Sequence, residues 1–278
     1  MKKKASEQKK QGIYAYAFSR IKNVDKNSLP TRGVAFAGKV EKAAYKDITV
    51  YFSRVDDKTY SKKAIESRLK KDMEWAKKNV LGHHKIIEKV RIQKNEVIPV
   101  KFGVMYASET SLMKFIETNY EKLSALFDEL KGKDEWDVKA YVVIPSIAED
   151  LVKKDPDLKM RLEQASSVSE GLKWYMAKKN QEIIKEKTDQ AILQGINKII
   201  RNIEHDCEKI ATIPGLVEQK KDEEMVWHGA ALVPREKEIV FLEKVNAIKK
   251  MKGWKLALSG PWPPYNFVGD LNNDSKSL

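Results

Sequence analysis

The order of strand-like and helix-like segments is the feature that most constrains the fold. In residues 12–133, three strand-patterned segments precede a helix, a strand and a second helix. In residues 134–268, the order is strand, two helices, strand, helix, strand. Neither half shows the strict alternation that builds a doubly wound parallel sheet. The sequence therefore predicts two α+β domains, flanked by tails at 1–11 and 269–278 that we expect to be disordered.

The strands expected in the first half are Gly12–Arg20, Gly33–Val40, Ile48–Val55 and Val97–Met105. Apolar and aromatic residues alternate along Gly12–Arg20, which predicts a strand covered on both faces. Polar residues alternate along Ile48–Val55, which predicts a half-exposed strand. Pro99 has no backbone N–H, so its strand should lie at a sheet edge or carry a bulge.

Two long helices are expected in the first half. The first begins near Asp57, with Ser61 as N-cap, and Gly82 marks a kink or break. Its predicted apolar stripe is Ile65, Leu69, Ala76, Val80, His84 and Ile87. The second helix runs from Ser108, another N-cap candidate, to Leu130, and Gly132 suits the left-handed position after its end.

The second half begins and ends with a strand. The expected strands are Trp136–Ile144, Met225–Pro234 and Trp254–Leu258, with a helix at Glu236–Met251 and a helical region from Asp157 to about Ala211 that is interrupted near 166–171. A strand–helices–strand–helix–strand order can build a ferredoxin-like sheet with one elaborated helical connection.

The formal net charge of +13 is unevenly distributed. Residues Lys58–Lys94 hold twelve Lys or Arg against four Asp or Glu, and the first ten residues hold five Lys against one Glu. Lysine-rich helices can follow phosphate backbones, but no nucleic-acid-binding motif is present. We therefore interpret the basic helix in the first place as a solvated face. The second interpretation is a docking surface for an acidic protein or an anionic surface, and the third is a nucleic-acid-binding module.

Residues arranged for catalysis are missing from the sequence. It has no Gly-rich phosphate loop and no G-x-S-x-G elbow, and four histidines with one cysteine cannot build a repeated zinc pattern. His83 and His84 point about 100° apart on a helix, which favours a packing or interface pair over a metal site. Cys207 lies between Asp206 and Glu208, which disfavours a thiolate. We therefore expect no catalytic residue, cofactor or metal.

The single cysteine fits a reducing compartment, and no apolar run approaches the roughly 20 residues that span a bilayer. Both observations favour a cytoplasmic protein that does not enter a membrane.

Three segments resemble a known family. They are Val97–Gly103 (VIPVKFG), Trp136–Tyr141 (WDVKAY) and Ser259–Phe267 (SGPWPPYNF). Each is similar to a signature of the gas vesicle L/F proteins, and the likeness extends over about residues 12–268. The Trp-containing long helix and the His83–His84 pair look closer to the L branch.

The resemblance implies two α+β domains, the second a modified ferredoxin-like fold. It also implies a non-catalytic accessory or minor structural role in gas vesicle assembly, with the gas vesicle shell protein and other accessory gas vesicle proteins as partners. The candidate partner-binding or structural residues are Pro99, Lys101, Phe102, Gly103, Trp136, Lys139, Tyr141, Gly260, Pro261, Trp262, Pro263, Pro264, Tyr265 and Phe267.

The segment Ser259–Phe267 has its own physical character. Gly260 permits unusual backbone conformations, and the three prolines favour a stiff, polyproline-like path. Trp262, Tyr265 and Phe267 then either lock the C-terminal segment against the domain or offer an aromatic surface to a partner. Both readings stay open at this point.

Overall fold

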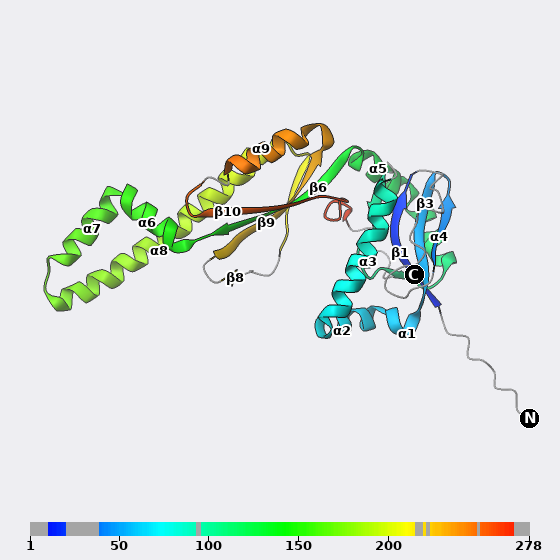
Figure 1. The fold of residues 1–278 in the computed structure, drawn as a ribbon, viewed down its shortest axis with the longest axis horizontal. Coiled ribbons are helices and arrows are strands. Elements are labelled where there is room, and N and C mark those ends of the chain that lie inside the picture. Colours follow the sequence, from blue (N-terminus) through cyan, green and yellow to red (C-terminus); the bar gives the residue numbers. More distant parts are fainter. Residues whose placement is uncertain are drawn as a thin grey trace, which may run out of the picture. The chain divides into compact units, whose positions relative to one another are not determined.

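The computed structural model describes residues 11–20, 39–92, 96–214, 219–220, 223–248 and 251–269 (Figure 1). Contacts between Cα atoms divide the chain into two compact units: unit 1 holds residues 1–133 and 262–278, and unit 2 holds 134–261. The sequence predicts 262–268 in the second domain, but their contacts group them with unit 1. The expected tails and the strand at 33–40 lie almost wholly outside the described residues.

Unit 1 contains an antiparallel sheet. Its strands are β2 (Val40–Tyr45), β3 (Ile48–Asp56), β1 (Gln11–Ser19) and β4 (Val97–Pro99) in that order, and β5 (Met105–Tyr106) also pairs with β1. Strand β2 is absent from the expected set, because its VEKAAY sequence has little apolar alternation.

Strand β3 is not half exposed, so that prediction is wrong. The polar residues Thr49 and Ser53 are buried, at 4% and 0% exposure, together with the apolar residues between them. The reason is helix packing: Tyr51 and Val55, which share a face of β3 with Thr49 and Ser53, lie in one core cluster with buried residues of α3 (Met73–Ile92). Ser53 is satisfied internally, since it accepts a hydrogen bond from the Tyr16 hydroxyl at 3.0 Å.

The segment Val97–Met105 forms two short strands rather than one. Pro99 pairs with Ala17, and β4 ends the strand order of this sheet within the described part of the chain, as its missing N–H predicts. A turn at 101–103 then separates β4 from β5. The chain still follows β1 there, because the Val100 N–H donates to the Tyr16 carbonyl at 2.8 Å.

The first helical region consists of α1 (Asp57–Tyr60), α2 (Lys62–Lys71) and α3 (Met73–Ile92). Ser61 caps α2 as predicted, accepting from the Ala64 N–H at 3.3 Å. The break lies at Asp72 and not at Gly82, which is inside α3. Asp72 itself makes the break, because its side chain accepts from the Trp75 N–H at 3.0 Å and so begins a new helix.

The buried face of α3 differs from the predicted stripe. Leu69 on α2 and Val80 on α3 are 39% and 42% exposed, although the predicted stripe places both in the core. The buried residues are Ala76, Asn79, His83, Ile86, Ile87 and Val90. Two of these are polar, which is why an apolar pattern misses the face.

The second helical region is also broken, into α4 (Glu109–Thr118) and α5 (Tyr120–Leu130). Its predicted ends are confirmed. Ser108 caps α4 through a reciprocal pair of hydrogen bonds with Ser111, each 3.1 Å long. Gly132 adopts φ +69°, a conformation that disfavours side chains with a Cβ.

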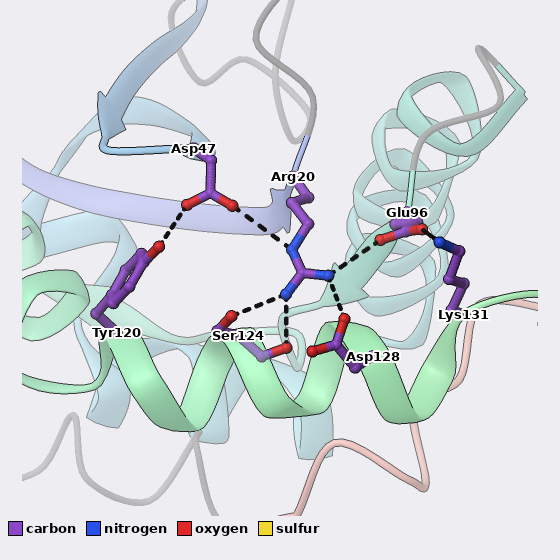
Figure 2. A network of polar contacts seen from close by, with 7 residues as sticks. All are labelled: Arg20, Asp47, Glu96, Tyr120, Ser124, Asp128 and Lys131. Atoms are coloured by element: carbon purple, nitrogen blue, oxygen red, sulfur yellow. Dashed lines mark hydrogen bonds and ion pairs between the residues drawn. The ribbon is translucent and has the colours of Figure 1, made fainter.

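Arg20, just after β1, holds several parts of unit 1 together (Figure 2). Its guanidinium donates to the Asp128 carboxylate at 2.5 Å and to both oxygens of Ser124 at 2.8 Å, all on α5. It also pairs with Asp47 in the β2–β3 turn at 3.6 Å and with Glu96 before β4 at 3.7 Å. One side chain thus fixes the end of β1 against a helix and two connections.

Unit 2 contains a second sheet, with the order β10 (Trp254–Trp262), β6 (Lys133–Val142), β9 (Glu223–Pro234), β7 (Lys209–Thr212), and β8 (Gln219–Lys220) beside β9. In chain order these four main strands are fourth, first, third and second. That is the order of a ferredoxin-like βαββαβ unit, so the predicted fold is confirmed.

The first connection in unit 2 is elaborated into α6 (Ile144–Lys154), α7 (Pro156–Ser166) and α8 (Glu170–Glu204) (Figure 1). The interruption between α7 and α8 is confirmed. Helix α6 is absent from the expected set; Pro145 lies in its first turn, where proline is tolerated. The second connection is a 3-10 turn (Arg235–Lys237) and α9 (Glu238–Ile248).

Candidate functional site on helix α3

Two of the three signature segments meet at adjacent histidines on α3 in unit 1. Because successive residues of a helix point about 100° apart, His83 and His84 face different neighbours. His83 is 2% exposed and contacts β1 and the segment after β4. His84 contacts the C-terminal segment 262–269.

His83 belongs to a chain of hydrogen bonds that begins and ends on the backbone of the first signature. Its Nε2 lies 2.8 Å from the Val100 carbonyl, and its Nδ1 lies 3.0 Å from the Tyr14 hydroxyl. A carbonyl only accepts, so Nε2 carries the proton and Nδ1 accepts from Tyr14. The Tyr14 oxygen in turn accepts from the Gly103 N–H at 3.2 Å.

Burial keeps this chain uncharged. It lowers the pKa of His83 to about 4 against the opposing effect of the hydrogen bond to the Val100 carbonyl, so the imidazole is neutral at pH 7. Burial also raises the pKa of Tyr14 well above its usual value. Both nitrogens of His83 are already hydrogen-bonded, so neither lone pair nor proton is offered to a substrate. The arrangement positions the backbone rather than performing acid–base chemistry.

Phe102 of the first signature fills the space beside this chain. Its ring centroid lies 5.7 Å from that of His83, 6.0 Å from Tyr14 and 6.4 Å from Trp75, all edge to face. Such aromatic pairs each stabilise by about 0.5–1.5 kcal/mol beyond area burial. Gly103 follows with φ +90°, a conformation that favours glycine, and its N–H donates to the Tyr14 hydroxyl.

His84 anchors the third signature. Its Nδ1 lies 3.0 Å from the Tyr265 hydroxyl, and its ring meets Trp262 edge to face at 5.1 Å. Burial lowers the pKa of His84 from its usual value. Pro263 and Pro264 between the two aromatics are buried, and Tyr265 packs against the core cluster of unit 1.

Within unit 2, the start of the third signature packs against the start of the second signature. Gly260 has φ +146°, and a Cβ there would come within 2.9 Å of both the Glu135 carbonyl oxygen and the Trp136 ring. Trp136 also packs against Phe241 of α9 at 6.2 Å. Strand β10 continues through Pro261 to Trp262, so the predicted end of the strand at Leu258 is wrong.

The remaining signature residues have varied surroundings. Pro99 and Tyr141 are buried in strands, at the edge of one sheet and inside the other. Lys139 and Phe267 are half-buried, and Lys101 is exposed. The sequence-selected residues therefore belong partly to unit 1 and partly to unit 2.

Tyr14 and Trp75 contribute to this site but are not among the candidate residues selected from the sequence. Tyr14 lies 69 positions from its partner His83, and local sequence spacing cannot predict a contact at that separation. The one available signal was the run of aromatics in β1, which predicts burial on both faces but not a hydrogen-bond partner.

Other reactive side chains also have partners within the protein. His228 on β9 pairs with the Asp137 carboxylate on β6, and Ser259 donates to the other oxygen of that carboxylate at 3.4 Å. Ser259 and His228 thus contact the same carboxylate, whereas in a Ser-His-Asp catalytic triad the histidine lies between the serine and the acid. Burial and Asp206 raise the pKa of the Cys207 thiol to about 12.

The described segments hold no group of three or more His, Cys, Asp or Glu side chains that could bind a metal ion. None of their helices is long and apolar enough to span a bilayer.

The family model for gas vesicle synthesis protein GvpL/GvpF matches residues 12–269. The chain belongs to this family. Gas vesicle protein F of Dolichospermum flosaquae is 24% identical over 207 residues, which cover 69% of this chain and 78% of the relative. Gas vesicle protein L1 of Halobacterium salinarum is 20% identical over 207 residues, covering 72% and 73%. Relatives of both names occur, so the expected closeness to the L branch stays a prediction.

Two solved structures have the same fold. The crystal structure of GvpF from Anabaena sp. PCC7120 has a TM-score of 0.69 at 17% identity, covering 93% of this chain and 98% of that one. GvpF from Microcystis aeruginosa has a TM-score of 0.63, also at 17% identity, covering 92% and 98%. The resemblance inferred from the three signatures is confirmed, and with it a role connected with gas vesicles.

Proposed function

We propose that this protein is a non-catalytic accessory or minor structural component of gas vesicle assembly. It acts in the cytoplasm and binds the gas vesicle shell protein, other accessory gas vesicle proteins, or both. The observation that carries the proposal is the family match over residues 12–269.

The geometry at α3 supports a structural rather than a catalytic role for the signatures. The His83 and His84 side chains hydrogen-bond to Tyr14, Val100 and Tyr265. These contacts hold the first and third signatures on one helix. Within the proposal, the third signature is a lock that fixes residues 262–269 on unit 1.

A gene deletion in a vesicle-forming host tests the proposal. The expected result is a loss of buoyancy, with vesicles absent or deformed under the electron microscope, and rescue by the wild-type gene. Normal vesicles in the deletion strain would falsify the proposed function.

The lock can be tested separately in the purified protein. Substituting His84→Ala removes both the hydrogen bond to Tyr265 and the ring contact with Trp262. Limited proteolysis should then cleave at 262–269 much faster than in wild type. A matched control is His205→Ala, an exposed histidine of unit 2, which should leave the cleavage rate unchanged. Equal cleavage of the His84 variant and wild type would remove the lock but leave the wider proposal standing.

A further inference from the structure

Helices α7 and α8 form an antiparallel hairpin that continues beyond the end of the unit 2 sheet (Figure 1). Its turn lies at 167–169, between the two helices. On the inner side, Asn180 is 6% exposed and donates to the Arg161 carbonyl across the hairpin at 3.3 Å. The hairpin is therefore packed along one side of α8 only.

The outer side of the first turns of α8 is apolar and exposed. Trp174 is 70% exposed, Tyr175 57% and Leu172 48%. Large aromatic side chains are usually buried at least in part, because each removes about 150–250 Å² from water. A single exposed apolar residue needs no explanation, but three within four positions form a patch.

Two lysines lie within this patch. At 100° per residue, Lys178 falls between Trp174 and Tyr175, and Lys179 falls between Tyr175 and Leu172. Both lysines are exposed, and the Lys178 ammonium lies 5.8 Å from the Trp174 ring. The outer face of α8 thus alternates apolar and positive side chains. We name Leu172, Trp174, Tyr175, Lys178 and Lys179 the hairpin surface.

We infer that the hairpin surface docks an acidic amphipathic helix of another gas vesicle protein. The aromatic and leucine side chains would pack on the apolar face of that helix, and the two lysines would pair with carboxylates along its edges. Exposed Trp and Tyr are the residue types that dominate binding at protein interfaces. This inference rests on the proposed function and names the chemistry of one partner.

Charge favours an acidic protein over the other candidates. Residues 159–179 carry five Lys or Arg against two Glu, so the hairpin end is positive. Over residues 144–204 the balance is eleven basic against ten acidic residues, so the positive region is short. A nucleic acid needs an array of positive charge along its backbone, and an anionic lipid surface needs a cluster of about four to eight Lys or Arg, whereas the hairpin surface holds only Lys178 and Lys179. A second copy would set lysines against lysines, because the same patch meets itself across a two-fold axis.

Direct binding to defined probes tests the inference. The probes are the shell protein and each accessory gas vesicle protein of the same genome, purified singly and titrated against the immobilised full chain. At least one should bind wild type, and the triple substitution Leu172→Ser, Trp174→Ser, Tyr175→Ser should weaken it at least about tenfold. The matched control is Leu193→Ser on the same helix, 60% exposed but outside the hairpin surface, which should change binding less than about twofold.

A second pair of variants tests the charges. Lys178→Glu with Lys179→Glu should weaken the same complex at least about tenfold, and added salt should weaken the wild-type complex. Lys185→Glu, an exposed lysine further along α8, is the control and should have little effect. All these side chains are exposed, so unchanged circular dichroism is expected in every variant.

Several results would overturn the inference. They are failure of every probe to bind wild type, equal binding by the triple variant, and binding that is lost equally in both controls. If the triple variant instead loses binding to phosphatidylserine vesicles or to a single-stranded oligonucleotide while its binding to every protein probe is unchanged, the partner is a lipid surface or a nucleic acid, and the inference is wrong. Concentration-dependent sedimentation that disappears in the triple variant would indicate self-association instead.

Complementation separates this inference from the proposed function. If the deletion strain forms normal vesicles, the proposed function fails. If wild type and the triple variant restore vesicles equally, only the docking inference fails.

Discussion

Aromatic side chains have opposite environments around α3 in unit 1 and on the first turns of α8 in unit 2. Around α3 in unit 1, Tyr14 and Phe102 surround a buried histidine, and Tyr265 packs on its neighbour. On α8 in unit 2, Trp174 and Tyr175 are largely in solvent. The same residue types therefore stabilise the fold in one region and remain accessible in the other. Residue type alone does not separate the two uses, but hydrogen bonding and burial do.

The largest effect that would test this comparison is expected at His83. His83→Ala removes the imidazole and leaves the Val100 carbonyl and the Tyr14 hydroxyl without their partner in a buried site. We expect unit 1 to lose about 3–5 kcal/mol of stability. Urea unfolding measures the loss, and hydrogen exchange of α3 assigns it to unit 1. A loss as small as that of His205→Ala would contradict the structural role of His83.

A pH dependence of nearly the same size follows from the pKa of His83. The folded protein keeps His83 neutral down to about pH 4, whereas the unfolded chain binds a proton near 6.5. The contribution of neutral His83 to stability is therefore fully present above about pH 6.5. It is lost as the pH falls from 6.5 toward 4, by up to about 3 kcal/mol at 1.36 kcal/mol per pH unit. Urea unfolding from pH 7.5 to 4 measures the slope, and most of it should disappear in His83→Gln.

A smaller effect is expected where the C-terminal segment meets α3. Tyr265→Phe keeps the ring and removes only the hydroxyl that bonds His84 Nδ1. Loss of one partly buried hydrogen bond should lower stability by about 1 kcal/mol. Thermal unfolding compares this variant with Tyr175→Phe, which changes the same atom on an exposed ring. Equal melting temperatures would mean that the Tyr265 hydroxyl has no role in stability.

The smallest effect is expected on the hairpin surface. Trp174→Ser with Tyr175→Ser removes two large rings, yet folding stability should change by no more than about 0.5 kcal/mol, because both are exposed. Trp75→Ser is the counterpart in unit 1, where the ring packs against Tyr60 and Phe102, and should be much more destabilising. Similar losses in both variants would remove the contrast between the regions.

Local signals predicted the fold well. The caps at Ser61 and Ser108, the glycine at 132 and the alternation in β1 each depend on a few neighbouring residues, and all four are confirmed. The helix break expected at Gly82 also rests on a local signal. Asp72 is an equally plausible break signal, and the break lies there. Only the hydrogen bond from Trp75 to Asp72 decides between them.

The site at α3 could be predicted only in part. The signatures singled out Phe102, Gly103 and Tyr265 through resemblance, without indicating what they contact. His84 and Tyr265 are 181 positions apart, and a contact at that separation follows from the whole fold. The buried polar residues Asn79 and His83 hid the true face of α3, since their burial depends on partners elsewhere in the chain.

The return of residues 262–269 to unit 1 has a consequence for synthesis on the ribosome. Domains commonly fold in order as the chain emerges, with the first domain complete before the next is made. Unit 1 does not fit that order, because its Tyr265 and buried Val268 are translated after all of unit 2. In the nascent first unit, the side of His84 that contacts Trp262 and Tyr265 therefore stays uncovered until residues 262–268 have been translated.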